Sequence, residues 1–470
     1  MNDAEPNPTI AEQSFSTLPL QDALLNNLVS LDYTTMTPVQ LQSLPILLKG
    51  YDVIAQAKTG SGKTIAFGLA LLNRLKVENY IVQALVLCPT RELAEQISQA
   101  LRQLARLIPN VKILNLSGGR SISPQLDSLR HGAHIIVGTP GRIKKHLDKG
   151  SLSINKLQTL ILDEADRMLD MGFFEEINNI LMRCPKPRQT LLFSATYPVE
   201  IKKLASAFMQ NPTKIMVKET HTALDIQQIF YETLQQKHKF SLLKSLLLHY
   251  KPSSALIFCN TKEQTIQLTK NLINEGFSAT ALNGDMEQSE RDIAIILFKN
   301  QSCSILVATD VAARGLDIKE LPAVINFELA FELDVHIHRI GRTGRAGHKG
   351  LALSLTMPAD AERLCLIEEN LMQPITWGNS SELNQINDTI LSPSVVTLCL
   401  SAGRKDKIRP GDILGALTKE AGLAANTIGK IDITALYSYV AVHDSQADIA
   451  FQHFKNKTLK GRKVNIKKIG

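Results

Sequence analysis

Short aliphatic runs that alternate with helix-like segments constrain the fold of this chain more than any other feature. In the first half of the chain, these runs lie at residues 52–56, 84–88, 134–138, 159–163 and 190–194. They are too short for helices, and their aliphatic content is typical of strands that are buried on both faces. Because strands that alternate with crossover helices form parallel sheets, the pattern predicts a parallel α/β domain.

The same alternation returns in the second half of the chain. Aliphatic runs lie at residues 255–259, 304–309, 323–327 and 351–356. We therefore expect two consecutive α/β domains that are joined near residues 212–225.

The last part of the chain follows a different plan. After a helical segment near residues 359–370, the polar stretch 371–393 contains Pro374 and Pro393 and is predicted to be a linker. Residues 394–470 then show the order strand, helix, strand, strand, helix, strand. This order is the split βαβ arrangement of the RNA-recognition fold, a small α+β fold. The order alone does not establish RNA binding, because that fold has many functions.

Length and composition agree with this organisation. A chain of 470 residues is long enough for about three domains, and its 44% of hydrophobic residues can fill their cores. The predicted parts are a disordered N-terminus at 1–13, α/β domains at 14–217 and 218–370, a linker at 371–393 and an RRM-like domain at 394–470.

Charge is distributed unevenly along the chain. Residues 1–393 hold 39 Lys and Arg against 39 Asp and Glu, whereas residues 394–470 hold 13 against 6. The whole net charge of +7 therefore lies in the last part. This asymmetry predicts a polyanion-binding module attached to a neutral body.

Cysteine placement and hydropathy limit the possible locations of the protein. The six cysteines are scattered singly, without the spacing of a zinc site or a disulfide framework. We expect thiols in a reducing compartment and no disulfide-linked partner. Residues 1–13 lack the features of a signal peptide, and no apolar run reaches the roughly 18 residues that span a bilayer. The expectation is a cytoplasmic protein without a membrane partner.

A glycine-rich segment, AKTGSGKT at residues 57–64, follows the first aliphatic run. Gly60 and Gly62 let the backbone curl so that its N–H groups cradle phosphates, Lys63 reaches the β- and γ-phosphates, and Thr64 can hold Mg²⁺. The alternative is a glycine-rich turn without a ligand. The strand-to-helix position of the segment favours a nucleotide site.

Three carboxylates, Asp163, Glu164 and Asp166, follow the aliphatic run at residues 159–163. Parallel sheets bind ligands beyond the carboxyl ends of their strands. In a P-loop NTPase, a carboxylate on a neighbouring strand completes the Mg²⁺ site, and a further polar residue orients the attacking water. Asp163 fits the first role and Glu164 the second, whereas Asp166 is expected to contact neighbouring motifs. A solvated acidic turn is the alternative.

The residues Asp163-Glu164-Ala165-Asp166 are the signature of the DEAD-box RNA helicases, and the resemblance continues in order from residue 15 to residue 350. It implies two RecA-like domains that bind ATP and Mg²⁺ and act on RNA. The matching segments are Phe15 with 37–40, 89–93, 118–119, 139–142, 194–196, 257–261, 288–291, 308–317 and 338–345.

For the nucleotide site, the resemblance implies that Gln40 reads the adenine edge while Phe15 packs on the base. The nucleotide-binding residues implied are Phe15, Gln40, Ala57, Thr59, Gly60, Ser61, Gly62, Lys63, Thr64, Gly315 and Asp317. Thr64 and Asp163 are the metal ligands, and the catalytic residues are Lys63, Asp163, Glu164, Arg342 and Arg345.

Arg342 and Arg345 lie in the second domain, so they must reach the γ-phosphate from another element. An arginine of this kind stabilises the negative charge of the transition state and is worth about 10³ to 10⁵ in rate. We therefore expect hydrolysis to require closure of the two domains. Exposed loop arginines paired to nearby acids are the alternative.

The RNA contacts implied by the resemblance go mostly to phosphate and sugar. They involve Pro89, Thr90, Arg91, Gly119, Thr139, Arg142, Asn260, Gln288, Arg291 and Thr309. Taken singly, each of these residues is as well explained as a loop or capping residue.

The C-terminal part resembles the DbpA subfamily of bacterial DEAD-box proteins at residues 403–423, 428–433 and 439–442. This resemblance implies recognition of a hairpin in the peptidyl-transferase region of large-subunit ribosomal RNA, with pre-ribosomal particles as partners in ribosome assembly. Arg404, Lys405 and Lys407 are the expected contacts in its basic loop.

The aromatic residues that usually stack bases on the sheet of an RRM-like domain are largely missing here. Base stacking on the sheet is therefore left open, as is a protein-docking role for the domain. Two other functions also stay open: a generalist DEAD-box helicase of cold adaptation or RNA decay, and a nucleotide-gated RNA clamp or scaffold.

Overall fold

The computed structural model describes residues 13–57, 60–119, 121–197, 199–216, 226–313, 321–344, 350–371, 374–383, 390 and 392–469. Its contacts divide the chain into two compact units, one before residue 217 and one after residue 225. Below, domain 1 is the first unit. The second unit holds domain 2, built on a six-stranded sheet, and the C-terminal domain, built on a four-stranded sheet. Within these ranges, no helix is both long and apolar enough to cross a membrane.

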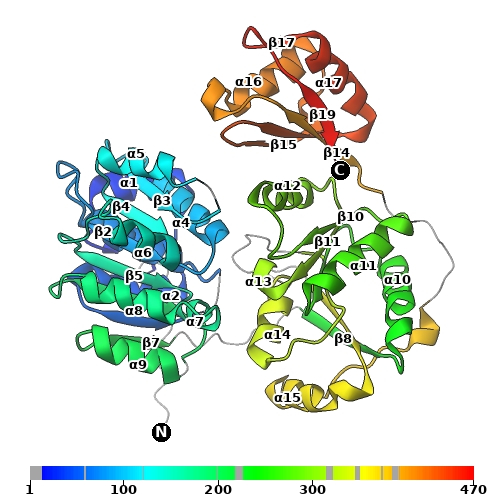
Figure 1. The fold of residues 1–470 in the computed structure, drawn as a ribbon, viewed down its shortest axis with the longest axis horizontal. Coiled ribbons are helices and arrows are strands. Elements are labelled where there is room, and N and C mark those ends of the chain that lie inside the picture. Colours follow the sequence, from blue (N-terminus) through cyan, green and yellow to red (C-terminus); the bar gives the residue numbers. More distant parts are fainter. Residues whose placement is uncertain are drawn as a thin grey trace. The chain divides into compact units, whose positions relative to one another are not determined.

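Domain 1 is a seven-stranded sheet with helices on both faces (Figure 1). The strand order is β3-β4-β2-β5-β6-β1-β7, and every neighbouring pair is parallel. The strands are β1 (Val53–Gln56), β2 (Ala84–Leu87), β3 (Ile113–Leu116), β4 (Ile135–Gly138), β5 (Thr159–Asp163), β6 (Gln189–Ser194) and β7 (Thr213–Met216). The helices are η1 (Phe15–Thr17), α1 (Asp22–Ser30), α2 (Pro38–Lys49), α3 (Lys63–Asn73), α4 (Arg91–Leu104), α5 (Ser123–Arg130), α6 (Pro140–Asp148), α7 (Ala165–Asp170), α8 (Phe174–Arg183) and α9 (Val199–Phe208).

The central strands of domain 1 are apolar because each face of the sheet carries a core. Successive side chains of a strand point to opposite faces. Along β2, Val86 joins the core under α1 to α4, whereas Leu85 and Leu87 join the core under α6 to α9. This arrangement confirms the predicted parallel α/β class.

Domain 2 has the sheet order β10-β11-β9-β12-β13-β8, again with only parallel pairs. Its strands are β8 (Ile226–Glu232), β9 (Ala255–Cys259), β10 (Ala279–Leu282), β11 (Ile305–Thr309), β12 (Ala323–Asn326) and β13 (Gly350–Thr356). Its helices are η2 (Gln236–His238), α10 (Lys239–Tyr250), α11 (Lys262–Asn274), α12 (Gln288–Lys299), α13 (Asp310–Ala313), α14 (Leu333–Ile340), η3 (Pro358–Asp360), α15 (Ala361–Leu371) and η4 (Ser380–Glu382).

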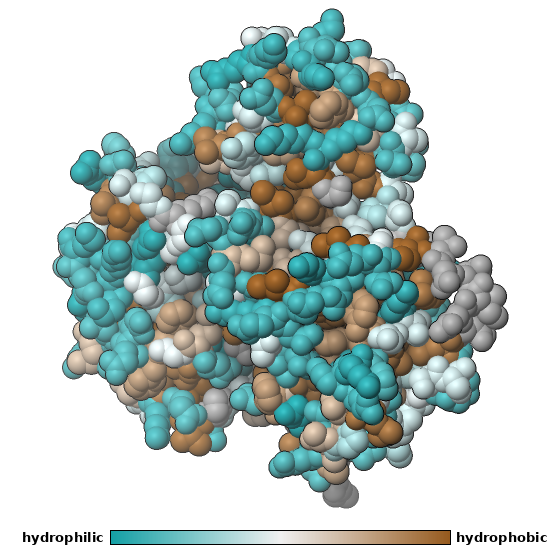
Figure 2. All heavy atoms as spheres, turned by 45° about the vertical axis from the view of Figure 1, so that its right-hand side comes forward, coloured by the Kyte–Doolittle hydropathy of each residue, from teal (hydrophilic) through white to brown (hydrophobic). Residues whose placement is uncertain are grey.

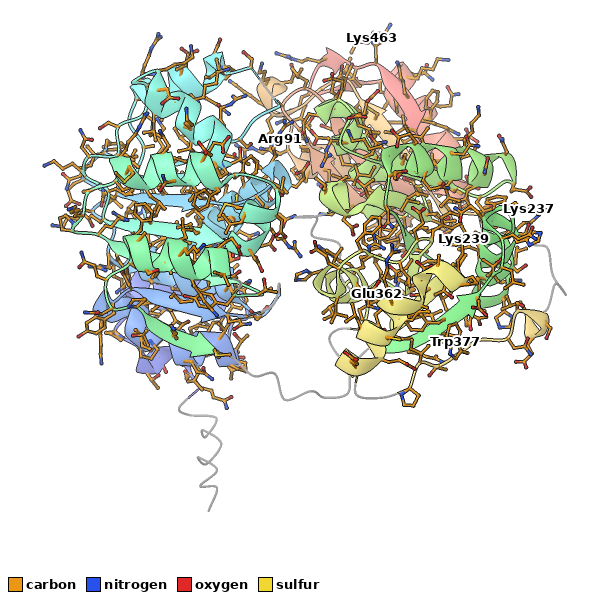
Figure 3. All side chains as sticks on the ribbon, turned by 60° about the horizontal axis from the view of Figure 1, so that its bottom comes forward. Arg91, Lys237, Lys239, Glu362, Trp377 and Lys463 are labelled. Carbon is orange, nitrogen blue, oxygen red and sulfur yellow. The ribbon has the colours of Figure 1, made fainter. Side chains whose placement is uncertain are left out.

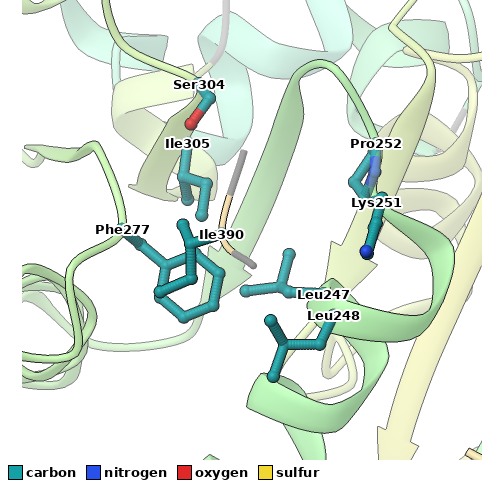
Figure 4. Close-up of a pocket in the computed structure, with 8 residues that line it drawn as sticks. All are labelled: Leu247, Leu248, Lys251, Pro252, Phe277, Ser304, Ile305 and Ile390. Atoms are coloured by element: carbon teal, nitrogen blue, oxygen red, sulfur yellow. The ribbon is translucent and has the colours of Figure 1, made fainter. Parts of the chain in front are cut away.

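The described part of the predicted linker packs on domain 2, and we call residues 374–383 the strap. Trp377 pairs with Phe230 as a short parallel bridge, so the strap extends the sheet beyond β8 (Figure 3). The backbone N–H of Gly378 donates to Phe230 O at 2.8 Å, and Leu383 is buried in the core of domain 2. Further along, Ile390 lies in an apolar pocket with Phe277 (Figure 4). The domain boundaries themselves remain predictions.

The C-terminal domain has an antiparallel sheet in the order β15-β16-β14-β19, with helices on one face. Together with the two parallel sheets, this small α+β domain confirms the predicted fold class. Its elements are β14 (Val395–Leu400), η5 (Arg404–Asp406), α16 (Pro410–Gly415), the π-helical turn η6 (Ala416–Glu420), η7 (Ala425–Thr427), β15 (Ile428–Ile433), β16 (Ser438–His443), α17 (Asp444–Asn456), the hairpin β17 (Thr458–Leu459) and β18 (Arg462–Lys463), and β19 (Ile466–Ile469).

Candidate nucleotide and RNA sites

The glycine-rich segment joins β1 to the start of α3. Gly60 and Gly62 have φ angles of 90° and 97°, in the left-handed region that glycine adopts without strain. Lys63 is the first residue of α3, and its Nζ donates a hydrogen bond to Ala57 O at 2.8 Å. A helix N-terminus after a glycine-rich turn is a phosphate-binding arrangement. The predicted contact Thr59 lies outside the described residues.

The acidic signature lies near this segment because β5 and β1 both flank β6. The two strands are therefore about 10 Å apart, and their carboxyl ends share one edge of the sheet. Asp163 ends β5 and is 3% exposed. Burial raises the pKa of its carboxyl to about 6, the Lys63 ammonium opposes this shift, and Glu164 adds to it.

Glu164 has an unusual backbone conformation for a side chain of its kind. Its φ angle is 54°, a left-handed value that is uncommon outside glycine and tends to persist at functional sites. Arg167 Nη1 donates to Glu164 Oε2 at 3.0 Å, and both side chains are 5% exposed. Arg167 therefore fixes the direction of the Glu164 carboxylate. The sequence predicted no role for Arg167, although it lies only three residues later, in the short helix α7 that Glu164 precedes.

Asp166 contacts the segment that follows β6, which confirms the expectation from sequence. Its Oδ2 accepts hydrogen bonds from the backbone N–H of Ala195 at 3.1 Å and of Thr196 at 2.8 Å. Burial alone would raise the pKa of Asp166, but hydrogen bonds from Thr196 and its neighbours hold it below its usual range. Asp166 thus ties the acidic signature to the Ser-Ala-Thr segment.

Gln40 and Thr37 contact the glycine-rich segment directly. Gln40 Nε2 donates to Gly62 O at 3.1 Å, and Thr37 Oγ1 donates to Ser61 O at 2.7 Å. A Cβ added to Gly62 would collide with the Gln40 amide, so only glycine fits there. Phe15 is 3% exposed and belongs to the core of domain 1. Gln40 and Thr37 therefore join the start of α2 directly to the glycine-rich segment.

Two oxygen donors at this edge, the Thr64 hydroxyl on α3 and the Asp163 carboxylate on β5, are suited to a hard divalent cation. Within the described ranges, no group of three or more His, Cys, Asp and Glu side chains is arranged to hold a metal.

In domain 1, the predicted RNA residues gather at the ends of β2, β3 and β4. Arg91 lies across Gly118 and Gly119 so closely that a Cβ at Gly119 would overlap its guanidinium (Figure 3). Burial lowers the pKa of Arg142, and the neighbouring charge of Arg91 lowers it further. Arg142 Nη1 donates to Gln125 Oε1 at 2.7 Å. Two arginines beside a glycine turn form a surface that fits a phosphate backbone.

The remaining predicted RNA residues of domain 1 lie at helix starts. Thr90 is the N-cap of α4 and accepts a hydrogen bond from Leu93 N at 3.2 Å. Pro89 precedes it, and Thr139 is the N-cap residue of α6. Thr90 has a capping role whether or not RNA is bound.

In domain 2, the carboxyl edge of the sheet is occupied by a network around Arg339, which the sequence reading did not single out. Arg339 is 1% exposed. Its Nε and Nη2 donate to the two oxygens of Asp310 at 2.7 Å each. Further bonds go to Glu328 O at 2.6 Å and to Asn260 Oδ1 at 2.8 Å. Its position within the segment HRIGRTGR, beside Arg342 and Arg345, was the feature of the sequence that could have indicated a role for it.

Other predicted residues of domain 2 have identifiable places. Gln288 and Arg291 lie in the first turn of α12, and Arg291 Nη1 donates to Asn283 O at 3.2 Å. Thr309 ends β11, and Arg342 is 8% exposed. The predicted residues Gly315, Asp317 and Arg345 lie outside the described residues.

The basic loop of the C-terminal domain lies beside the hairpin β17–β18. Lys460 Nζ donates to Lys407 O at 3.0 Å, and Arg462 pairs with Asp406 at 2.5 Å. Lys405 and Lys407 are exposed. Figure 2 shows hydrophilic side chains over much of the visible surface of this domain, and Lys463 projects outward from it (Figure 3). Loop and hairpin thus form one basic surface.

Comparison with known proteins agrees with this geometry. Residues 37–204 match the DEAD/DEAH box helicase family, residues 238–347 the helicase conserved C-terminal domain and residues 397–468 the DbpA RNA binding domain. The chain is 48% identical over 455 residues to the ATP-dependent RNA helicase DbpA of Escherichia coli, covering 97% of this chain and 99% of that protein. Identity to the DbpA of Bacillus subtilis is 37% over 476 residues, covering 97% and 99%.

A solved structure gives the same result for the helicase part. Saccharomyces cerevisiae Dbp5 bound to RNA and ADP BeF3 superposes with a TM-score of 0.70 at 29% identity, covering 79% of this chain and 96% of that one. The chain therefore belongs to the DEAD-box family of ATP-dependent RNA helicases, as a DbpA-like member with an RNA-binding C-terminal domain.

Proposed function

We propose that this helicase uses Mg²⁺ to hydrolyse ATP when RNA brings its two helicase domains together. We further propose that the C-terminal domain directs it to large-subunit ribosomal RNA during ribosome assembly. Short RNA duplexes are separated in the closed state, and hydrolysis reopens it. The basic surface formed by the loop at 404–407 and the hairpin at 458–463 carries the targeting proposal.

At the nucleotide site, each side chain has a distinct task. Lys63 and the backbone of the glycine-rich segment bind the β- and γ-phosphates. Thr64 and Asp163 would hold the cation, which would neutralise charge on the phosphate oxygens. Glu164, held in direction by Arg167, orients the attacking water. The burial of Asp163 fits this role, because a neighbouring cation stabilises its ionised form.

Arg342 and Arg345 complete the site by stabilising charge on the γ-phosphate. Arg342 lies in the loop that follows α14 and is buried, which supports a fixed orientation of that loop. Because both arginines belong to domain 2, hydrolysis depends on domain closure, and RNA contacts on both domains make closure depend on RNA.

Targeting is supported by how the basic surface is arranged. Asp406 and Asp412 pair with Arg462 and Lys460 on the hairpin, and these pairs hold the loop and the hairpin together. Such a surface binds phosphates and makes binding dependent on salt. The basic surface alone does not determine which RNA is bound. The choice of ribosomal RNA as the target follows from the DbpA resemblance.

RNA-stimulated ATP hydrolysis tests the proposal. The full chain and a version that ends at Pro393 are each given either a fragment of large-subunit ribosomal RNA containing the peptidyl-transferase region or an unrelated RNA of equal length, at one salt concentration. We expect only the full chain to prefer the ribosomal fragment. Equal responses of both versions to both RNAs would replace targeting with a generalist helicase.

A pair of charge variants tests the basic loop within the full chain. Lys405→Gln with Lys407→Gln should weaken the preference for the ribosomal fragment. Lys455→Gln with Lys457→Gln, on exposed residues at the end of α17, removes the same charge elsewhere on the domain. If both pairs have the same effect, only total charge matters and the loop is not the recognition site.

A further inference from the structure

Helix α5 follows the glycine turn at residues 117–119 and lies near β3, an outer strand of the domain 1 sheet (Figure 1). It begins at Ser123 and ends at Arg130, and none of its residues is buried. A helix with so little apolar contact needs polar bonds to keep its place. One of its side chains, that of Gln125, forms hydrogen bonds with two other segments of the domain.

The Gln125 amide joins the glycine turn to the start of α6. Its Nε2 donates to Ser117 O at 3.0 Å, and its Oε1 accepts a hydrogen bond from Arg142 Nη1 at 2.7 Å. Arg142 is the third residue of α6, and Ser117 directly precedes Gly118 and Gly119. One side chain therefore connects two of the segments that we expect to contact RNA phosphates.

His146 fixes the orientation of this amide. It is buried, and its Nε2 lies 3.0 Å from Gln125 Oε1. Burial lowers the pKa of the His146 ring, and the charge of Arg142 lowers it further. A neutral ring that meets an amide oxygen carries its proton on Nε2, which leaves Nδ1 to accept from the Ser151 hydroxyl at 2.9 Å. The amide oxygen then has two donors and cannot exchange places with the amide nitrogen.

The bond from Arg142 to Gln125 goes to a neutral acceptor. Elsewhere in the protein, Arg167 and Arg339 are paired with carboxylates. A carboxylate offsets the charge of a guanidinium, whereas an amide oxygen orients the group and leaves its charge intact. Burial lowers the pKa of Arg142, and the charge of Arg91, which lies across the glycine turn, lowers it further. Two guanidinium groups that repel each other favour an anion beside them, as a phosphate of RNA would be.

We propose that Gln125 is a positioning residue for RNA: its amide clamps the glycine turn to the start of α6, so that the turn and Arg142 keep the spacing that a phosphate backbone requires. Gln125 acts through Ser117 and Arg142 and is not itself a phosphate contact. The inference rests on the proposed RNA-dependent function of the helicase domains, and it does not depend on which RNA is the target.

RNA affinity in the closed state is the first measurement. The full chain is titrated against a fluorescent oligouridylate in the presence of Mg²⁺, ADP and beryllium fluoride, which together stand in for ATP. Gln125→Leu keeps the approximate size of the side chain and removes both bonds, so the dissociation constant should rise about tenfold. Gln103→Leu, on the exposed surface of α4, makes the same change away from the turn and should bind like the parent. An unchanged dissociation constant in Gln125→Leu would overturn the proposal.

ADP affinity in the absence of RNA separates positioning from a general loss of structure. The clamp does not include Lys63 or the rest of the glycine-rich segment, so Gln125→Leu should bind ADP within about twofold of the parent affinity. Parallel losses of ADP and RNA affinity would show that Gln125 holds domain 1 together as a whole and would overturn the positioning role.

Gln125→Glu tests the bond to Ser117. Its carboxylate still accepts from Arg142 and His146, but it lacks the N–H that binds Ser117 O, and its charge offsets that of Arg142. RNA binding should again weaken by about tenfold, and its dependence on salt concentration should become less steep. Parent-like RNA affinity in Gln125→Glu would contradict the clamp, because the bond to Ser117 would then be dispensable.

A double-mutant cycle with Arg142 separates this inference from the proposed function. Arg142→Gln should weaken RNA binding about 30-fold through the loss of a charged contact. Gln125→Leu added to it should cost no more than about a further threefold, because Gln125 acts largely through Arg142. A full further tenfold loss would show that the two residues act independently and would overturn the inference alone. Parent-like RNA binding in Arg142→Gln would overturn both the inference and the RNA contact on which it rests.

Discussion

At the carboxyl edge of the domain 1 sheet, Lys63, Asp163 and Glu164 lie around a phosphate loop, whereas the same edge of domain 2 is filled by the Arg339 network. Both sheets are parallel and have helices on both faces. In domain 1, the adjacent carboxylates of Asp163 and Glu164 are both buried, and burial raises the pKa of Asp163 to about 6. In domain 2, the buried guanidinium of Arg339 is paired with Asp310.

The difference separates two uses of buried charge. An edge whose charges serve a ligand should lose mainly activity on mutation, although Glu164 is also paired with the buried Arg167 and its loss should cost some stability as well. An edge whose charges are paired within the protein should lose stability, because removal of one partner leaves the other buried and uncompensated. The following variants test this division.

The largest effect is expected at Glu164. Glu164→Gln keeps a carbonyl oxygen for Arg167 but removes the carboxylate that orients water. RNA-stimulated ATP turnover should fall by about 10³, in the range of a lost general base, while RNA affinity is retained. Steady-state hydrolysis and RNA titration measure the two quantities.

Glu175→Gln, on the exposed surface of α8, is the matched control and should retain turnover. Glu164→Gln leaves the buried Arg167 guanidinium without its countercharge, so a modest loss of thermal stability is expected. Loss of RNA affinity would break the comparison, because Glu164 would then act on more than the chemistry. Retained turnover would remove Glu164 from the proposed chemistry.

The second effect is expected at Arg339. Arg339→Met leaves Asp310 without its partner and removes the bond to Asn260, so domain 2 should lose about 3–5 kcal/mol of unfolding free energy. Because a protein of several domains does not unfold in two states, hydrogen exchange of β11 and β12 peptides is the appropriate measurement.

Arg363→Met provides the contrast, because the pair of Arg363 with Asp360 is partly exposed. A change below about 1 kcal/mol is expected there. Similar exchange in both variants would show that the Arg339 network does not hold the edge together.

The third effect concerns pH and His336. His336 is 2% exposed, stacks with Phe230 and has no hydrogen-bond partner for either ring nitrogen among the described residues. Burial lowers its pKa to about 4, and the nearby charge of Arg339 contributes. The neutral ring is compatible with the fold, so its contribution is present above pH 6.5 and is lost as pH falls from 6.5 toward 4.

This residue alone should cost domain 2 roughly 2 kcal/mol between pH 7 and pH 4.5. His336→Phe should remove that part of the pH dependence, whereas His249→Phe, on the exposed end of α10, should not. Hydrogen exchange of domain 2 at both pH values measures the difference. An unchanged pH dependence in His336→Phe would assign the acid sensitivity to other groups.

Central and edge strands differ in how far the sequence could predict them. The central strands were predicted because burial on both faces selects continuous aliphatic runs. Four strands of the two parallel sheets escaped prediction, and these strands, β3, β7, β8 and β10, are the outer ones. Their sequences mix polar and apolar residues because one side or end is exposed, as in the pattern of β7, where only Ile215 is buried.

Prediction of the candidate site residues from the sequence meets the same limit. Lys63 and Asp163 could be predicted because their spacing and strand context follow from phosphate chemistry. Arg167 and Arg339 could not, because their roles depend on which carboxylates the fold brings near them. The role of Gln125 likewise depends on Arg142, which is 17 residues away from it in the chain.

The smallest effect is expected at the strap, where domain 2 relies on backbone packing instead of paired charge. A Cβ added to Gly378 would overlap the Tyr231 ring, so Gly378→Ala should force the strap away from β8 at a cost of about 1–2 kcal/mol. Trp377 is the one tryptophan of the chain and is half exposed beside Phe230, so its fluorescence reports the strap.

Gly415→Ala is the matched control, because a Cβ there meets nothing within 4 Å and lies in a helix, where alanine is favoured by about 0.5–1 kcal/mol. We expect greater quenching of Trp377 by acrylamide in Gly378→Ala and no change in Gly415→Ala. An unaltered Trp377 signal in both variants would mean that the strap does not depend on this contact. The strap would then add nothing measurable to domain 2, and the contrast with domain 1 would rest on the Arg339 network.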